Sequence, residues 1–456
     1  MPPYPKNALM KRISLAIFAG SFAFLLSAQV PNPAPAGLEK FHPTKAPEPT
    51  QLLLKEGDRL AICGDSITEQ KMYSRIIEDY LTMCVPELHV SVRQYGWSGE
   101  RAPGFLARMT NDCLRFKPTI ATTCYGMNDH EYRPYEDRIG QTYREKSTAI
   151  VEAFKANGVR VIQGSPGCVG KMPAWVKTAS GTVEDLNLNL CELRNIGIEI
   201  AIKEQVGFAD VFWPMLKAGA AAQAEYGTNY AIAGKDGVHP GWAGHAVMAY
   251  AFLKALGLKG DIAAFSVDLA KNQLLPSTKG HTVVSTKQGG EFQIRSTRYP
   301  FCVCVPTNNF SATYPVCAEV DPARDNSIWS AMTLVPFEKE LNRFMLVAKN
   351  GKAANYRVGW GDETKTFSQS QLAAGINLAE WFPRNPFSEA FAKVDAAVAA
   401  KQTYETRQIK MEFHGAEGKT NILAVVDRTE KAREPLVEAV GAAFVPVTHT
   451  IKIEAE

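Results

Sequence analysis

Two short motifs in the first half of the chain hold the residue types that nucleophilic acyl transfer uses. Gly64-Asp65-Ser66 offers a hydroxyl nucleophile, and Asp236-Gly237-Val238-His239 offers an imidazole with a carboxylate three residues before it. A carboxylate at that spacing on a loop can accept a hydrogen bond from imidazole Nδ1 and leave Nε2 free as a base. A serine beside such a base can be activated to attack a carbonyl carbon.

Two further motifs between these offer hydrogen-bond donors. The segment Tyr95-Gly96-Trp97-Ser98-Gly99-Glu100-Arg101 contains glycines, at which the backbone can approach a substrate closely with an N–H pointing at it. The segment Tyr125-Gly126-Met127-Asn128-Asp129 contains an asparagine, whose neutral amide can stabilise an oxyanion without quenching a base.

Each motif alone is more often a turn or a helix N-cap than a catalytic element, because turns and caps favour the same residue types. Their conjunction is the stronger signal. The four motifs fall in order along the chain, three of them at the ends of successive candidate strands. Together they supply a nucleophile, neutral donors, and a base with an orienting carboxylate.

The elements that must position these motifs lie between residues 52 and 258, where short apolar runs alternate with longer amphipathic ones. Strands are predicted at Arg59–Cys63, His89–Gln94, Thr119–Tyr125, Arg160–Gln163 and Gly207–Phe212. Helices are predicted at Gln70–Met83, Gly104–Phe116, Gln141–Asn157, Val183–Gln205 and Ala243–Leu256. Strands separated by helices predict a parallel sheet, and right-handed crossovers then give a three-layer α/β/α sandwich.

On these motifs the chain resembles the SGNH hydrolases, also called GDSL-type esterases and lipases, over roughly residues 52–258. The four motif blocks of that family are matched by Gly64-Asp65-Ser66, Ser98-Gly99-Glu100, Gly126-Met127-Asn128-Asp129 and Asp236-Gly237-Val238-His239. The second block departs from the common family pattern, because this chain has Gln94 and Glu100 where many members have Asn and Asp. The oxyanion donor of this block is expected to be Gly99 rather than Gly96.

The resemblance implies a flavodoxin-like fold and a serine esterase that works through an acyl-enzyme. In this reading Ser66 attacks the ester carbonyl, His239 transfers the proton, and Asp236 orients the imidazole. The backbone N–H groups of Ser66 and Gly99, together with the Asn128 amide, form the oxyanion hole. No metal and no organic cofactor is expected.

Four other residues near the motifs have two readings each. Trp97 and Trp242 could form the floor of a sugar site, although packing in the core or at the rim is at least as good an account. His130 is expected to be a solvated loop residue, with a place in the pocket as the alternative. His245 is expected to be a packing or capping residue.

Beyond residue 259 the chain has a different texture, and no motif there indicates a role. Short strand-like runs separated by glycine and polar clusters indicate a mainly-β region, and the predicted strands are His281–Ser285, Phe292–Ser296, Phe301–Pro306, Met332–Pro336, Arg343–Val347 and Tyr356–Trp360. A helical segment is predicted around Ser388–Gln402, and the apolar stretch Val440–Ile453 is β-prone. The C-terminal region therefore spans 259–456.

The N-terminus has the pattern of an export signal. Basic residues up to Arg12 precede the apolar stretch Ile13–Ala28, which is shorter than the roughly 20 residues of a membrane span. A signal peptide is predicted at 1–28 and a Pro-rich linker at 29–51, with an uncleaved anchor or a buried first helix as the alternatives. The protein is expected to be secreted or to lie in the periplasm or cell envelope, with no stable membrane span after signal removal.

The charge balance and the cysteine spacing limit the classes of partner and metal site that the sequence predicts. The 50 basic and 47 acidic residues nearly balance, which gives no electrostatic reason to expect a nucleic acid or an anionic membrane. The nine cysteines include no pair with zinc-like spacing. In an oxidising compartment Cys302, Cys304 or Cys317 could form a disulfide.

The expected substrate is a small-molecule or polysaccharide ester, with short acyl groups favoured, especially acetyl esters on carbohydrates. Three alternatives stay open: an esterase of lipid or aryl esters, a sugar O-acyltransferase using the same triad, and a non-catalytic carbohydrate-binding protein on this fold.

Overall fold

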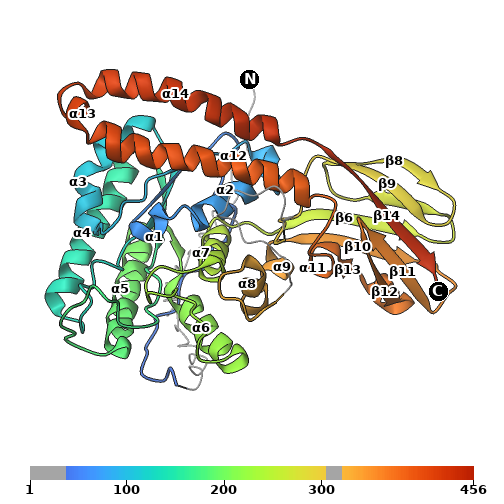
Figure 1. Cartoon of the computed structure of the whole chain (residues 1–456), viewed down its shortest axis with the longest axis horizontal. Coiled ribbons are helices and arrows are strands. Elements are labelled where there is room, and N and C mark those ends of the chain that lie inside the picture. The colour runs from blue at the N-terminus through green and yellow to red at the C-terminus, as the bar shows by residue number, and fades with distance from the viewer. Residues whose placement is uncertain (1–36, 305–320) are drawn as a thin grey trace, which may run out of the picture. The chain divides into compact units, whose positions relative to one another are not determined.

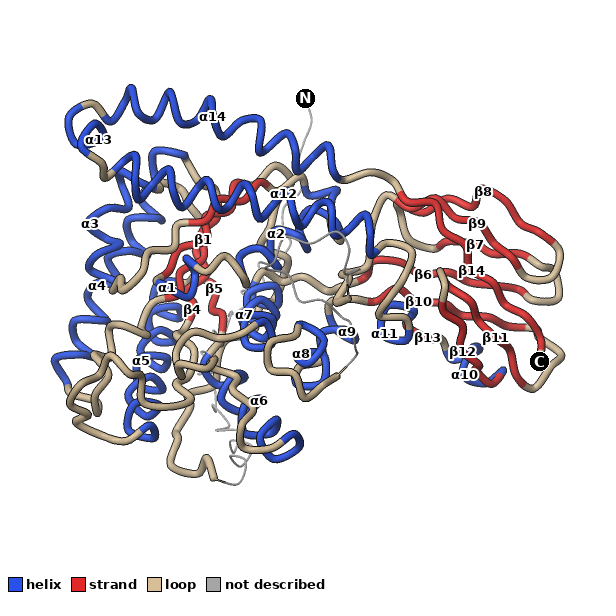
Figure 2. Tube along the Cα trace, in the orientation of Figure 1, coloured by secondary structure: helices blue, strands red, loops and turns tan. Residues whose placement is uncertain are grey.

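Five parallel strands form the sheet of the first half of the chain, in the order β2-β1-β3-β4-β5. The computed structural model describes residues 37–304 and 321–456 and is drawn in Figures 1 and 2. The strands are β1 (Arg59–Gly64), β2 (Ser91–Gln94), β3 (Ile120–Cys124), β4 (Arg160–Gly164) and β5 (Gly207–Ala209). Because the chain runs outward from β1 to β2 and then returns to β3 on the other side of β1, the topological switch point lies between β1 and β3.

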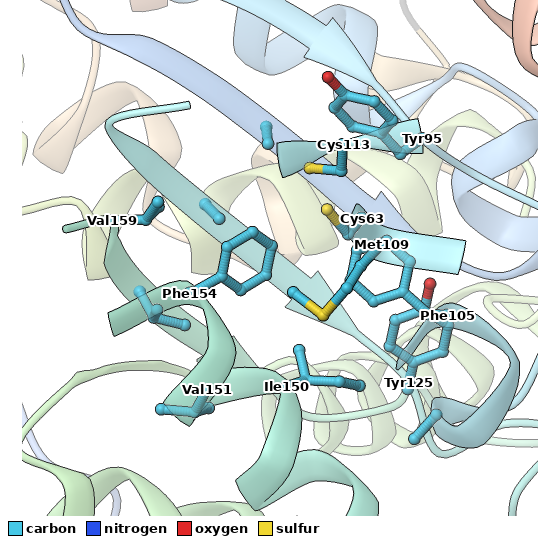
Figure 3. Packing of buried hydrophobic residues seen from close by; sticks show 14 of the residues in the cluster. Cys63, Tyr95, Phe105, Met109, Cys113, Tyr125, Ile150, Val151, Phe154 and Val159 are labelled. Carbon is cyan, nitrogen blue, oxygen red and sulfur yellow. The ribbon is translucent and has the colours of Figure 1, made fainter. Parts of the chain in front are cut away.

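Helices cover both faces of this sheet, which confirms the predicted α/β/α sandwich. They are α1 (Ser66–Glu69), α2 (Tyr73–Met83), α3 (Ala102–Asp112), α4 (Asp137–Ala156), α5 (Val183–Glu204), α6 (Phe212–Tyr226) and α7 (Trp242–Ala255), with short 3-10 turns at Pro86–Leu88 and Leu114–Phe116. Figure 3 shows the core on one face, where Phe105 and Met109 of α3 and Phe154 of α4 pack over Cys63 of β1. On the other side, Tyr73 of α2 stacks on Phe252 of α7, with ring centroids 5.5 Å apart.

Two further sheets follow residue 260. One has the order β13-β10-β6-β7 and the other β12-β11-β14-β9-β8. The strands of the first are β6 (Asp261–Asp268), β7 (Gln273–Pro276), β10 (Arg343–Lys349) and β13 (Ile376–Asn377). Those of the second are β8 (His281–Lys287), β9 (Glu291–Ser296), β11 (Asn355–Trp360), β12 (Glu363–Ser368) and β14 (Val447–Ala455).

An aromatic core joins these two sheets. Phe344 of β10 stacks on Trp360 of β11 at 5.3 Å, and Phe265 of β6 meets His449 of β14 edge-on at 6.4 Å. All strand pairs of the second sheet are antiparallel, whereas β6 and β10 of the first pair in parallel. The expected mainly-β region is therefore present, with one parallel pair inside it.

Two predicted strands in this region need correction. Met332–Pro336 is not a strand, because residues Ile328–Leu334 form helix α8, with Ile328 and Ala331 buried one helical turn apart. The other predicted strand is Phe301–Pro306. Its residues 301–304 have no regular structure, and residues 305 and 306 lie outside the described part of the chain.

Helices make up much of the remainder. Short ones surround the β region: α9 (Phe337–Glu340), α10 (Gln369–Ala374) and α11 (Leu378–Trp381). The predicted helical segment is longer than expected, since α12 (Ser388–Arg407) runs into a π-helical segment (Gln408–Phe413), and α13 (Ala416–Thr420) and α14 (Ile422–Ala443) follow. In Figures 1 and 2 α12 and α14 lie side by side, and α14 was not predicted at all.

Helix α12 covers the edge strand of the parallel sheet. Lys401 Nζ donates to the carbonyl of Val92 at 2.8 Å, and Glu405 accepts the N–H of Gln94 at 3.2 Å. The Gln94 side chain donates to Thr406 Oγ1 at 2.6 Å. Because an edge strand presents unpaired backbone groups, these side chains complete hydrogen bonds that the sheet leaves open.

Two of the cysteines that were candidates for a disulfide differ in their state. Cys304 is disulfide-bonded, whereas Cys302 keeps a thiol that donates to Asn385 Oδ1 at 3.6 Å.

In the described ranges, no helix combines the length and apolar character needed to cross a membrane. The predicted signal peptide and residues 29–36 of the predicted linker lie outside those ranges, and the rest of the linker, 37–51, forms no helix or strand.

Candidate active site

Ser66 lies at the switch point of the sheet, as the first residue of α1 directly after β1. The turn into α1 is tight: a Cβ on Gly64 would collide with the Thr68 side chain, so only glycine fits there. Asp65 caps the helix, since its Oδ1 accepts the N–H of Ile67 at 3.0 Å. Burial raises the pKa of Asp65 to about 7.

His239 and Asp236 approach Ser66 from the loop before α7. His239 Nε2 lies 2.8 Å from Ser66 Oγ, and His239 Nδ1 lies 2.7 Å from Asp236 Oδ2. The second carboxylate oxygen of Asp236 accepts the N–H groups of Val238 and His239, both at 2.9 Å. Burial acts to raise the pKa of Asp236, but these donors outweigh it and hold the pKa below its ordinary value. The structure therefore brings the three predicted residues into one hydrogen-bonded chain.

The two predicted backbone donors are the N–H groups of Ser66 and Gly99. Gly99 has a φ of +73°, in the left-handed region that favours glycine, and its place for a Cβ is open space. In the described part of the chain, neither the N–H of Ser66 nor that of Gly99 has a hydrogen-bond acceptor. By contrast, the N–H of Gly96 donates to the Gln94 side chain. This difference favours Gly99 over Gly96 as the donor.

Asn128 lies after β3, across the switch point from Ser66. Its Nδ2 donates to the carbonyl of Glu100 at 3.1 Å, and its Oδ1 accepts from Tyr132 at 3.2 Å. These two bonds fix which end of the amide faces the Gly99 loop. Because an amide nitrogen carries two protons, the second one is available to a substrate.

Glu100 and Gln94, the two departures from the family pattern, hold the Gly99 loop in place. Glu100 is buried and pairs with Arg108 through both oxygens, at 2.6 and 2.7 Å. It also accepts from the Tyr125 hydroxyl at 2.8 Å, while Arg108 donates to the carbonyl of Tyr95 at 2.7 Å. This buried ion pair therefore anchors the Gly99 loop to α3.

Trp175 is a site residue that the sequence interpretation missed. Its ring lies 5.8 Å from the His239 ring and meets the Tyr132 ring edge-on at 5.9 Å. The residue is 44% exposed, unusual for tryptophan, so it forms an open aromatic wall beside the triad. The sequence feature that could have identified Trp175 is its position in a loop after β4, at the carboxyl edge of the sheet.

The four residues with two readings resolve into packing roles. Trp242 is buried near Arg75, and Trp97 packs between cationic side chains, so neither forms an open floor. The expectation of a solvated His130 is wrong: the residue is fully buried beside Tyr132, and burial lowers its pKa to about 4. His245 is a buried packing residue, whose Nδ1 accepts the N–H of Tyr73 at 3.3 Å.

Comparisons with known proteins agree with this architecture. Residues 62–247 match the model of the GDSL-like lipase/acylhydrolase family. The solved structure of a gut microbial diltiazem-metabolizing enzyme is 21% identical with a TM-score of 0.69, and the alignment covers 89% of this chain and 100% of that one. The sandwich and the C-terminal region thus occur together in that fold.

Smaller structures match about half of the chain. An acetylxylan esterase from Geobacillus stearothermophilus, solved as a catalytic mutant, is 22% identical over 45% of this chain and 96% of that one, with a TM-score of 0.37. No curated protein matches the chain significantly in sequence. The family match covers the sandwich with its Ser66 and His239 motifs, so this domain is identified as one of the GDSL-like lipase/acylhydrolases, which are carboxylic ester hydrolases of the SGNH superfamily.

Proposed function

We propose that the protein is an exported serine esterase that hydrolyses short-chain esters, chiefly acetyl esters on carbohydrates. The observation that carries the esterase mechanism is the hydrogen-bonded chain from Asp236 through His239 to Ser66. It joins a carboxylate, an imidazole and a hydroxyl in the order that nucleophilic acyl transfer needs.

In this mechanism Ser66 Oγ attacks the ester carbonyl while His239 Nε2 takes its proton. Asp236 holds the imidazole through Nδ1 and stabilises its charged form. The N–H groups of Ser66 and Gly99 and the Asn128 amide bind the tetrahedral oxyanion, each donor being worth about 10²–10³ in turnover. His239 returns the proton to the leaving alcohol, and water then resolves the acyl-enzyme by the same steps.

The carbohydrate preference rests on the aromatic wall beside the triad. Trp175 is exposed next to His239, and Tyr132 supports it from the Asn128 loop. A sugar ring presents an apolar C–H face and polar edges, which matches an open indole that combines an apolar face with a polar tip.

The first test measures hydrolysis of an aryl acetate by the native chain and by Ser66→Ala. We expect activity in the native chain and its loss in the variant, with fluorophosphonate labelling only in the native chain. If the native chain neither hydrolyses the ester nor takes up the label, the esterase mechanism is wrong and a carbohydrate-binding protein is the better account.

The second test separates sugar esters from other esters. We expect Trp175→Ala to lower kcat/KM by about 10-fold on acetylated xylooligosaccharides, but by less than about 3-fold on ethyl acetate, because only the sugar loses a stacking surface of about 0.5–1.5 kcal/mol. Trp175→Phe keeps an aromatic face and serves as the matched control. An equal loss on both substrates would remove the case for a sugar site.

The reaction products distinguish ester hydrolysis from acyl transfer to a sugar. With an acetyl donor and an excess of free oligosaccharide, the proposed esterase releases acetate. Acetylated oligosaccharide as the main product would instead identify the sugar O-acyltransferase alternative. Activity confined to long-chain or aryl esters would favour the lipid or aryl esterase.

Export is tested by the mass of the protein recovered from the periplasm or medium of a bacterial host. The predicted signal peptide gives a mature chain that begins at Gln29. A full-length mass in the membrane fraction would mean that the segment is an uncleaved anchor.

A further inference from the structure

The π-helical segment Gln408–Phe413 contacts the active site from far along the sequence. Lys410 Nζ pairs with both carboxylate oxygens of Glu69, at 2.7 and 2.9 Å. Glu69 is the last residue of α1, the four-residue helix that begins with Ser66. The same ammonium lies 5.3 Å from the centre of the Trp97 ring, within range of a cation–π interaction.

Glu69 passes this contact on to the Gly99 loop. Its Oε2 accepts the N–H of Ser98, the residue before Gly99. Burial acts to raise the pKa of Glu69, but the bonds from Lys410 and Ser98 outweigh it and hold the pKa below its ordinary value. Glu69 is therefore ionised at neutral pH and able to bind both donors.

Trp97 is in contact with two parts of the chain. Arg108 of α3 lies 5.0 Å from its ring centre. His414 meets the ring edge-on at 4.9 Å and bonds to Asp112 at 2.8 Å. The tip of the loop has no such support, because Gly99 is exposed and nothing lies within 4 Å of its missing Cβ. The direction of the Gly99 N–H thus depends on its flanks, which are Trp97 and Ser98 before it and the ion-paired Glu100 after it.

We propose that Lys410 is a positioning residue of the active site, which fixes the Gly99 N–H toward the oxyanion by holding Glu69 and Trp97. This inference rests on the proposed function, in which Gly99 is an oxyanion donor. It gives the C-terminal region a part in turnover, although that region lies outside the family match. A purely structural role for Lys410 predicts lower stability with normal turnover of the folded enzyme.

The test compares kcat and KM for an aryl acetate in the full chain and in a set of single and double variants. Lys410→Met removes the charge and keeps the length of the side chain, and Lys410→Arg keeps the charge. Lys431→Met is the matched control, because the ion pair of Lys431 with Asp427 on α14 is exposed and is the one that Lys431 makes within the described residues. Active-site titration with a fluorophosphonate corrects each rate for the fraction of folded enzyme.

We expect Lys410→Met to lower kcat by about 10-fold with KM changed less than about 2-fold, because a misdirected donor weakens binding of the transition state more than that of the substrate. Lys410→Arg should recover kcat to within about 3-fold, and Lys431→Met should equal the native chain. Glu69→Gln combined with Lys410→Met should lose no more than the larger single loss, since both act through one ion pair.

A second readout does not depend on turnover. Amide hydrogen exchange of residues 95–101 should be faster in Lys410→Met than in Lys431→Met. A titrated kcat in Lys410→Met equal to that of Lys431→Met, with native exchange, would overturn the positioning role. A native chain without any esterase activity would instead overturn the proposed function, and faster exchange in the variant would then assign Lys410 to the loop alone.

Discussion

The carboxylate of Asp236 has its two oxygens committed to different tasks. One accepts two backbone N–H groups and the other faces His239 Nδ1. An amide in its place can serve the backbone donors only by turning its NH₂ group toward the imidazole. That group is a donor, so it would favour the wrong tautomer of His239.

We therefore expect Asp236→Asn to lower kcat by at least about 100-fold at neutral pH, with KM little changed; the same change costs about 10⁴ in the chymotrypsin triad. Steady-state kinetics on an aryl acetate would measure this. Asp137→Asn, at an exposed position in the first turn of α4, is the control. Unchanged turnover in Asp236→Asn would show that another group orients His239.

Glu338 gives a pH dependence of stability at a single buried residue. Burial raises its pKa to about 8, and among the described residues its carboxyl group has one hydrogen-bond partner, Asn342, at 2.8 Å. A carboxyl group with a raised pKa binds its proton more tightly in the folded state. Its contribution is thus complete below the unfolded pKa and is lost as pH rises toward 8.

We expect Glu338→Gln and the native chain to have similar free energies of unfolding at pH 4.5. At pH 8.5 the free energy of unfolding of the variant should be larger by on the order of a few kcal/mol, which a higher melting temperature would show. Glu340→Gln on the same helix is the control, because burial acts to raise the pKa of Glu340 but the bonds from Lys254 and Tyr250 outweigh it and hold the pKa below its ordinary value. That variant should be slightly less stable than the native chain, by a constant amount from pH 6 to 8.5. A Glu338→Gln curve parallel to the native one would contradict the raised pKa.

Among the elements, α12 is distinguished by charged side chains that point into the protein. Glu405 is fully buried and accepts from Lys401 at 2.9 Å, from Arg433 at 2.8 Å and from the N–H of Gln94 at 3.2 Å. Its pKa is lowered, since these cations outweigh the effect of burial. One carboxylate thus links α12, α14 and the edge strand β2.

Neutralising that carboxylate leaves buried Lys401 with Glu78 alone and Arg433 with only a 4.0 Å contact to Glu430, so Glu405→Gln should lower the free energy of unfolding by about 3 kcal/mol. Urea unfolding followed by circular dichroism measures this. Glu412→Gln, which weakens partly exposed pairs with Arg407 and Arg428, should cost less than about 1 kcal/mol. Similar losses in the two variants would mean that the buried network contributes little to stability.

The elements differ in how far the sequence predicts them. The strands of the parallel sheet follow from apolar runs that end at Gly64, Gln94 and Gly126, and these runs also locate the catalytic motifs. Helix α14 could not be predicted in this way, because Pro435 lies inside it, where proline is a helix-breaking signal, and few of its side chains are buried. Lys401 and Glu405 look like a solvated helix face in sequence. Trp175 and Lys410 reach the site only through tertiary contacts that no local pattern records.

At the scale of the molecule, the sandwich is completed by residues from the C-terminal region. Ile409, Phe413 and Val425 belong to the same core cluster as Phe105 and Phe154. Burial of three such side chains is worth roughly 5–8 kcal/mol, which is comparable with the stability of a whole domain. The sandwich alone would also expose the edge of β2.

A chain of residues 40–258 should therefore fail to give a soluble monomer with a cooperative thermal transition. Size-exclusion chromatography and circular dichroism would compare it with residues 40–456. Recovery of the shorter chain on co-expression with residues 259–456 would support completion by the missing helices. A shorter chain that melts like the longer one would contradict this account.

The place of β14 has a consequence for synthesis. This strand lies in the middle of its sheet, between β11 and β9, so both neighbours keep open edges until residues 447–455 have left the ribosome. At about 5–20 residues per second, roughly 10–40 s separate the end of the sandwich from that moment. A nascent chain therefore carries an open edge on β9, and later one on β11 as well, until β14 is made, and every premature stop before that point releases a product that quality control must remove.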